Sequence, residues 1–486
     1  MEIKISKSDW LFLFTCLLLG IVAEESFFRS EIGISYMVFI FSFYAVFFFR
    51  YRRFSFTHQR IGYLILCIIW LLAAGFFLND NVLFHLLNIL VIPGLVIFHL
   101  VLVTSPKNYR WAQPLFVLYL FSRIFEMFKY NTGFARAASK RLKQGRDEDK
   151  LLVWKKIALG IAISLPVLII VLTLLMSADS QFERIIGGIP DWFRVIDAES
   201  FIRLIIILIY TSAFFGFMQV LFHKQIQVIQ QEVKESAGVL DAIITITVLV
   251  LINAVYVLFT MVQFKYFFGG QLQGDFTYAE YARKGFFELL FVTLINLSIL
   301  VAALTLVRFT SKTIKRLTQS LLTILVLVSS VMLCSAFLRL SMYEDAYGFT
   351  LTRVLAHTFM VFLAVIFTYT LVKIWFEKLS LFHFYFIASL LFYTAVTVLD
   401  VNQIVVGENI QRFEKTGKID VQYLNSLSYT GVLGLIELYE KNKSIPGLQT
   451  VLQENKEEKL SSEYPWQSYN LQRERAIKAL KKLDLY

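Results

Sequence analysis

Long runs of apolar residues fill most of the chain up to about residue 400, and polar positions gather in the short segments between them. A run of about 20 apolar residues can cross the hydrocarbon core of a bilayer as a helix, so the pattern predicts about eleven membrane spans. The expected spans are residues 9–26, 32–49, 61–78, 82–103, 157–176, 202–222, 239–263, 285–307, 319–337, 354–375 and 380–400.

One apolar segment, residues 111–128, departs from this pattern. It holds Pro114 and turns polar at Arg123, Glu126 and Lys129. We therefore expect an interfacial helix there, and the alternative is a twelfth crossing.

Lysine and arginine crowd into the loops of one side, at residues 50–60, 107–110, 129–156 and 308–316. Loops rich in these residues usually face the cytoplasm. The N-terminus is therefore predicted inside and the chain from residue 401 outside, across the plasma membrane. The domains expected are an N-terminal membrane region at 1–128, a basic cytoplasmic loop at 129–156, a membrane core at 157–400 and an extramembrane tail at 401–486.

The tail is polar and periodic. Gly417 reads as a helix stop and Asp420 as the N-cap of the next helix. The last helix places Ala476, Ile477 and Leu480 opposite a row of basic residues. That apolar face either lies on lipid headgroups or packs inside the tail, and we favour packing.

Composition supports the membrane assignment. The 486 residues are 57% hydrophobic and 17% charged, with a mean hydropathy of +0.64. Soluble domains average about 45–50% apolar and about 25% charged. We therefore expect an all-α, polytopic transmembrane bundle, surrounded by the lipid bilayer, with a small helical tail. The net charge of +11 follows the basic loops, so no nucleic acid partner is expected.

Familiar catalytic and metal motifs are missing. The chain has no phosphate-binding loop, no H-E-x-x-H, no C-x-x-C and no G-x-S-x-G, and its six histidines are scattered. Cys16, Cys67 and Cys334 all fall inside apolar runs. We expect no catalytic residue, metal site or cofactor, and we lean against an enzyme.

Acidic, basic and tyrosine residues cluster instead in three segments that are predicted to lie on the outer face. A carboxylate, guanidinium and phenol cluster there could bind an anionic group. Tyrosine and arginine at span ends are also ordinary interfacial anchors, and that alternative stays open. The candidate binding residues are Asp179, Tyr281, Arg283, Glu288, Arg339, Tyr343, Tyr347 and Arg353.

Five ordered segments resemble a known family. They read S-A-D-S-Q-F at 177–182, Y-A-R-K-G-F-F-E-L at 281–289, R-L-S-M-Y-E-D-A-Y-G-F-T-L-T-R at 339–353, N-I-Q-R-F-E-K-T-G-K-I-D-V-Q-Y-L-N-S-L-S at 409–428 and W-Q-S-Y-N-L-Q-R-E-R-A at 466–476. The chain from about residue 150 onward thus resembles the bacterial multi-pass membrane proteins called domains of unknown function 4173 and 4153. It departs from them at Tyr429, Thr430 and Gly431, where the family tends to have an acidic residue and a proline. The resemblance implies a bacterial membrane location and, since that family has no established activity, no catalytic residue.

The function expected is binding or scaffolding of an envelope component, or of a membrane or envelope protein partner, at the extracytoplasmic face. One alternative is a transporter or lipid flippase with His85, Asn88, Asn253 and Asn296 along its path. Another is a membrane-embedded enzyme for a lipid-linked substrate. It would use Asp179, Glu280 or Glu288 as the base and Arg283, Arg339 or Arg353 to hold phosphate.

Overall fold

The computed structural model describes residues 5–485, with gaps at 108, 110, 114, 144–155, most of 158–197, 224–239, 264–285 and 310. The chain divides into two compact units. The first contains Met1–Ala73, Val91–Ile226 and Tyr464–Tyr469, and the second contains Ala74–Leu90, Gln227–Glu463 and Asn470–Tyr486.

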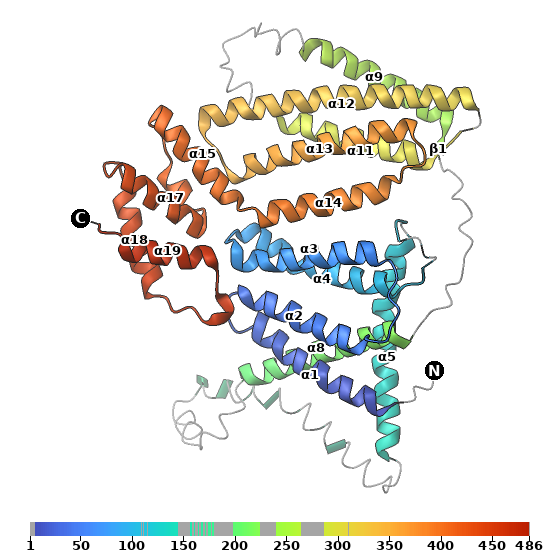
Figure 1. Ribbon diagram of the computed structural model, residues 1–486, viewed down its shortest axis with the longest axis vertical. Coiled ribbons are helices and arrows are strands. Elements are labelled where there is room, and N and C mark those ends of the chain that lie inside the picture. Colours follow the sequence, from blue (N-terminus) through green and yellow to red (C-terminus); the bar gives the residue numbers. More distant parts are fainter. Residues whose placement is uncertain are drawn as a thin grey trace. The chain divides into compact units, whose positions relative to one another are not determined.

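Helices make up nearly all regular structure in the described residues (Figure 1). Nine of the described helices are long and apolar enough to cross a membrane. They are α1 (Lys7–Phe27), α3 (Gln59–Leu78), α4 (Val82–Thr104), α8 (Ala198–His223), α9 (Ala242–Gln263), α11 (Phe286–Leu306), α12 (Lys312–Tyr347), α13 (Leu351–Trp375) and α14 (Leu381–Val398). Helix α2 (Ile34–Arg50) is apolar but shorter, and the predicted span at 157–176 lies mostly outside the described residues. The predicted all-α class is confirmed.

In the first unit, α1 packs against both α2 and α8. Helix α5 (Leu115–Lys143) runs across the Lys7 end of α1 and the His223 end of α8 (Figure 1). Its Phe134 ring lies 5.8 Å from Trp10 and 4.7 Å from Phe215. The helix continues past residue 128 into the predicted basic loop because Phe134 and Ala138 are buried. Its assignment to the membrane interface stays a prediction.

In the second unit, α12 is the central helix and packs against α9, α11 and α13. Leu325, Met332 and Ala336 of α12 are buried in this core. At 1.5 Å per residue, the 36 residues of α12 span about 54 Å, well beyond a hydrocarbon core of about 30 Å. One end of α12 therefore extends out of the core. Two short strands, β1 (Leu240–Asp241) and β2 (Val307–Arg308), pair in parallel.

The tail is helical, and its residues are divided between the two units. Its elements are α15 (Val401–Thr416), α16 (Val421–Asn425), α17 (Ser428–Lys441), α18 (Leu448–Ser461), a 3₁₀ turn η2 (Trp466–Ser468) and α19 (Leu471–Lys482). As predicted, Gly417 ends α15 in the left-handed conformation and Asp420 caps α16 by accepting from the Tyr423 amide.

Helix α19 buries its apolar face against α17 and α18. Ala476 and Leu480 are fully buried there, next to Leu435 and Leu452 of the tail core. The packing alternative for the last helix is therefore confirmed. The basic side chains of α19 are exposed at Arg475, Lys478, Lys481 and Lys482, whereas Arg473 is half-buried.

Candidate binding site on the helical tail

The structure describes five of the eight candidate residues. Asp179, Tyr281 and Arg283 lie outside the described residues. Glu288 lies exposed in the first turn of α11. Arg339, Tyr343, Tyr347 and Arg353 lie around the turn from α12 to α13.

Three of these residues come together. The Arg353 guanidinium lies 4.2 Å from the centre of the Tyr343 ring, which lies 5.0 Å from the Tyr347 ring. Arg353 also donates a hydrogen bond to the Gly348 carbonyl of the same turn. This arginine holds its own loop, so the cluster is less open to an anion than the sequence suggests. Its role in binding stays a prediction.

A contact between a half-buried histidine and a buried glutamate, which the sequence analysis missed, lies next to this cluster. His357 Nδ1 lies 2.9 Å from Glu344 Oε2, which joins α12 to α13. The other ring nitrogen lies 3.3 Å from both Ser341 Oγ and the Phe337 carbonyl. Glu344 and His357 are 13 positions apart on two different helices, so no single-helix spacing connects them.

The tail packs on the turn from α12 to α13. Asn409 of α15 accepts from the Phe349 amide at 3.1 Å and donates to the Phe349 carbonyl at 2.8 Å. Arg412 donates to the carbonyls of Asp345 and Ala346, at 3.2 and 2.8 Å. This loop and α15 therefore lie at the same end of the second unit.

The turn between α3 and α4 is the second segment that forms hydrogen bonds with the tail. Asn79 donates to the carbonyls of Thr397 and Val398 at 2.8 and 2.9 Å, and the Thr430 amide donates to Asp80 Oδ2 at 3.0 Å. Asn470 donates to the Asn79 carbonyl at 2.6 Å.

In the first unit, the segment Tyr464–Tyr469 packs on the turn between α1 and α2. Gly33 donates to the Gln467 carbonyl at 3.0 Å, and a Cβ at Gly33 would lie 2.5 Å from the Tyr469 carbonyl oxygen. Gln467 donates to Glu25 at 2.7 Å. Within each unit, part of the tail thus contacts turns between the long apolar helices.

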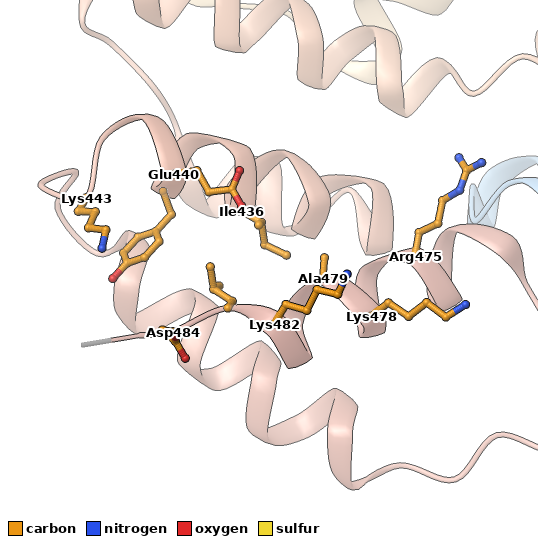
Figure 2. A pocket seen from close by; sticks show the side chains of 10 residues that line it. Ile436, Glu440, Lys443, Arg475, Lys478, Ala479, Lys482 and Asp484 are labelled. Carbon is orange, nitrogen blue, oxygen red and sulfur yellow. The ribbon is translucent and has the colours of Figure 1, made fainter.

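A groove lies between α17 and α19 on the tail, with a volume of about 570 Å³ (Figure 2). Figure 2 shows Lys443 at one end, Arg475 and Lys478 at the other, and Lys482 between them. Four lining residues are cationic and two, Glu440 and Asp484, are acidic. The remaining lining residues are Ile436, Tyr439, Ala479 and Leu483.

The three cationic residues of α19 that line the groove could bind an anion together. Arg475, Lys478 and Lys482 are three and four positions apart, so they share one face of α19 and repel one another. Lys478 has a partner in Glu474, at 2.5 Å on the exposed surface. Apolar side chains under a charged rim suit a ligand that is part apolar and part anionic.

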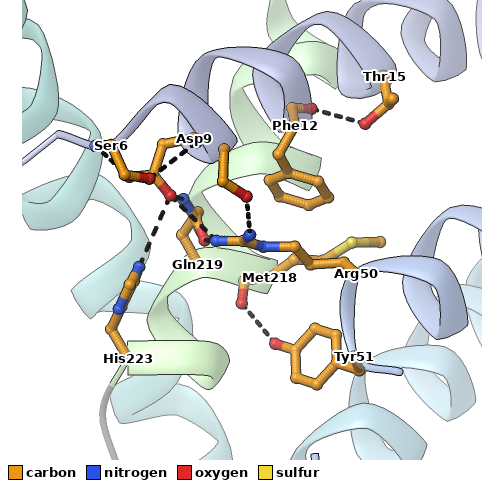
Figure 3. A network of polar contacts seen from close by, with 10 residues as sticks. Ser6, Asp9, Phe12, Thr15, Arg50, Tyr51, Met218, Gln219 and His223 are labelled. Atoms are coloured by element: carbon orange, nitrogen blue, oxygen red, sulfur yellow. Dashed lines mark hydrogen bonds and ion pairs between the residues drawn. The ribbon is translucent and has the colours of Figure 1, made fainter. Parts of the chain in front are cut away.

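The first unit contains a polar cluster in which a buried aspartate has a cationic partner, positioned by α1, α2 and α8 (Figure 3). Arg50 of α2 lies 3.0 Å from Asp9 of α1, and Gln219 of α8 donates to the same Asp9 oxygen at 2.8 Å. Asp9 also accepts from the amide and hydroxyl of Ser6, which forms a capping box. The side chains of Asp9 and Arg50 are only 6% and 10% exposed, so this cluster clamps three helices.

Polar residues inside the spans connect neighbouring helices. Asn253 donates to the Leu321 carbonyl at 3.0 Å, Asn296 to Ser329 Oγ at 2.8 Å, and Asn88 accepts from Tyr393 at 2.8 Å. Such bonds hold helices together in lipid. Among the described residues, no group of three or more His, Cys, Asp or Glu side chains could hold a metal ion.

These features define a polytopic membrane protein with a helical C-terminal tail. The chain belongs to the family described as domain of unknown function (DUF4153), which matches residues 66–438. The match begins earlier than the resemblance suggested and ends within α17, so the 466–476 segment lies beyond it. No curated protein and no solved structure matches the chain.

Proposed function

We propose that this membrane protein binds a phosphate-bearing lipid of the cell envelope through the groove of its tail, on the extracytoplasmic face. The observation that carries the proposal is the row of cations along α19, which borders a groove with an apolar floor. A lipid headgroup supplies the anion, and the adjoining glycerol and acyl carbons can cover Ile436, Ala479 and Leu483.

The size of the groove supports this class of ligand. Small-molecule sites in proteins span about 300–1,000 Å³ and combine apolar walls with a few placed polar groups. A guanidinium can grip two phosphate oxygens at once, whereas lysine acts as a point charge, so Arg475 is the expected anchor and Lys478 and Lys482 are expected to add attraction.

The proposal is tested by flotation of the full-length protein, in phosphatidylcholine nanodiscs, with two kinds of vesicle. We expect binding to vesicles that contain phosphatidylglycerol and none to vesicles of pure phosphatidylcholine. Inorganic phosphate should compete if the phosphate group is recognised. Equal binding to both kinds of vesicle would contradict the proposal.

A matched pair of variants separates the groove from diffuse charge. Arg475→Gln with Lys482→Gln should weaken vesicle binding about tenfold, which corresponds to about 1.4 kcal/mol. Lys415→Gln with Lys418→Gln removes the same charge from exposed positions outside the groove and should change binding less than about twofold. Equal losses in the two variants would show general electrostatic attraction and would refute a groove site.

A further inference from the structure

Two carboxyl groups in the second unit converge on one hydroxyl group. Thr430 Oγ1 lies 3.1 Å from Asp80 Oδ1 and 2.9 Å from Asp400 Oδ2. Asp80 belongs to the turn between α3 and α4, Asp400 is the N-cap of α15, and Thr430 lies in the first turn of α17. Asp80 is 7% and Thr430 4% exposed, so water has little access to their side of the contact, whereas Asp400 is half-buried.

The Thr430 hydroxyl has fewer protons than it has short contacts with carboxyl oxygens. A hydroxyl group carries one proton, so Thr430 can donate to only one of the two carboxyl groups. The Thr430 amide already donates to Asp80 Oδ2. The second short oxygen contact becomes a hydrogen bond only if one carboxyl group is protonated and donates to the hydroxyl oxygen.

No cation in the described residues forms an ion pair with either carboxyl group. Around them, Gln472 of α19 donates to Asp400 Oδ2 at 3.1 Å, and the Gln403 amide donates to Asp400 Oδ1 at 3.2 Å. The charged groups that face the pair from the packed helices are His85 of α4, which interacts electrostatically with Asp80, and Arg473 of α19, which interacts with His85. A buried and a half-buried carboxylate that lie this close without a paired cation repel each other, which favours keeping one of them neutral.

We propose that Asp80 and Asp400 share one proton through the Thr430 hydroxyl, and that loss of this proton loosens the tail from the turn between α3 and α4. In the protonated state, Asp400 donates to Thr430 Oγ1 and Thr430 donates to Asp80. On deprotonation the proton passes to water, two carboxylates face one hydroxyl proton, and one of the two contacts breaks. This latch is independent of the groove and of what the groove binds.

The direction of the pH effect follows from Asp400. Burial, and then the nearby Asp80, raise the pKa of the Asp400 carboxyl above its ordinary value of 3.8, although the hydrogen bond with Thr430 lowers it in part. The folded chain therefore holds this proton more tightly than the unfolded chain does. The stability contributed by the latch is fully present below pH 3.8 and is lost as the pH rises through the raised pKa of Asp400.

The experiment uses the full-length protein in phosphatidylcholine nanodiscs. Infrared spectra across a pH series record the carboxylic acid C=O band, and thermal unfolding at each pH gives Tm. We expect a band that persists above the ordinary range of aspartate and disappears in Asp400→Asn, together with a fall in Tm across the same pH interval that this variant lacks. Identical titrations in the wild type and Asp400→Asn would overturn the proposal.

Two controls keep the test decisive. Asp420→Asn changes the other capping aspartate of the tail, which accepts from the Tyr423 amide at 2.9 Å, and should leave the band and the pH dependence of Tm unchanged. If Asp400→Asn does not fold, Thr430→Val should move the titration, while Thr430→Ser, which keeps the hydroxyl, should restore it. Equal titrations in Thr430→Val and Thr430→Ser would refute the shared proton.

Discussion

The Asp9 cluster in the first unit and the Asp80–Asp400 contact in the second unit both hold aspartate side chains that are buried or half-buried, but the negative charge is compensated only in the first. Asp9 accepts from Arg50, Gln219 and Ser6, so its negative charge is matched on every side. Asp80 and Asp400 face each other across a single hydroxyl group. The first arrangement is a permanent clamp, whereas the second responds to proton concentration.

The largest effect should come from breaking the clamp. Arg50→Gln leaves Asp9 buried without its cation, and removal of one partner from a buried ion pair costs about 3–5 kcal/mol. We expect a marked drop in Tm of the detergent-solubilised protein. Arg52→Gln, at an exposed position in the same loop, should have little effect.

The double variant Asp9→Asn with Arg50→Gln sharpens this test. It removes both charges, so it should recover part of the stability lost in Arg50→Gln. A double variant that is less stable than Arg50→Gln alone would contradict the claim that an uncompensated charge causes the loss.

A smaller effect is expected at Gly431, which follows Thr430. A Cβ at this position would lie 1.9 Å from the Leu424 carbonyl oxygen, so Gly431→Ala must displace the first turn of α17 and with it Thr430. We expect a loss of about 2–3 kcal/mol, measured as a fall in Tm. Gly407→Ala is the matched control, because nothing lies within 4 Å of its Cβ and alanine is the better helix former.

The smallest effect should come from the capping box of α1. Ser6→Ala removes the hydroxyl that accepts from the Asp9 amide and donates to the Asp9 carboxylate, at a cost of about 1 kcal/mol. Ser8→Ala removes only an exposed contact with Arg50 and should change Tm less. Equal losses in the two variants would argue against a specific role of the cap in positioning Asp9.

The sequence predicted the spans and the packing of the tail because both depend on local patterns. Apolar runs of span length and the periodic face of α19 need no knowledge of distant residues. The caps at Gly417 and Asp420 were predictable for the same reason.

The polar sites depend on contacts between distant segments. Asp9, Arg50 and Gln219 are far apart in the sequence, and Asp80 precedes Thr430 by 350 positions. In the sequence, Arg50 looks like one of the basic residues that mark the cytoplasmic side, so nothing in the sequence indicates that it pairs with Asp9. The one local signal at the second site was the expected departure from the family pattern at Tyr429, Thr430 and Gly431, which stays a prediction. A single sequence does not say which residues meet there.

The central claim is that the helical tail and the turn after α12 share the extracytoplasmic face. Single cysteines at Ser461, Asp345 and Ser311, all exposed positions, can be labelled on intact cells by a membrane-impermeant maleimide after replacement of Cys16, Cys67 and Cys334. Ser311 precedes α12 and Asp345 lies near its other end, so these two positions report opposite ends of one helix. We expect labelling at Ser461 and Asp345, and at Ser311 only after lysis. Labelling of intact cells at Ser311 but not at Ser461 and Asp345 would place the tail in the cytoplasm and contradict the account.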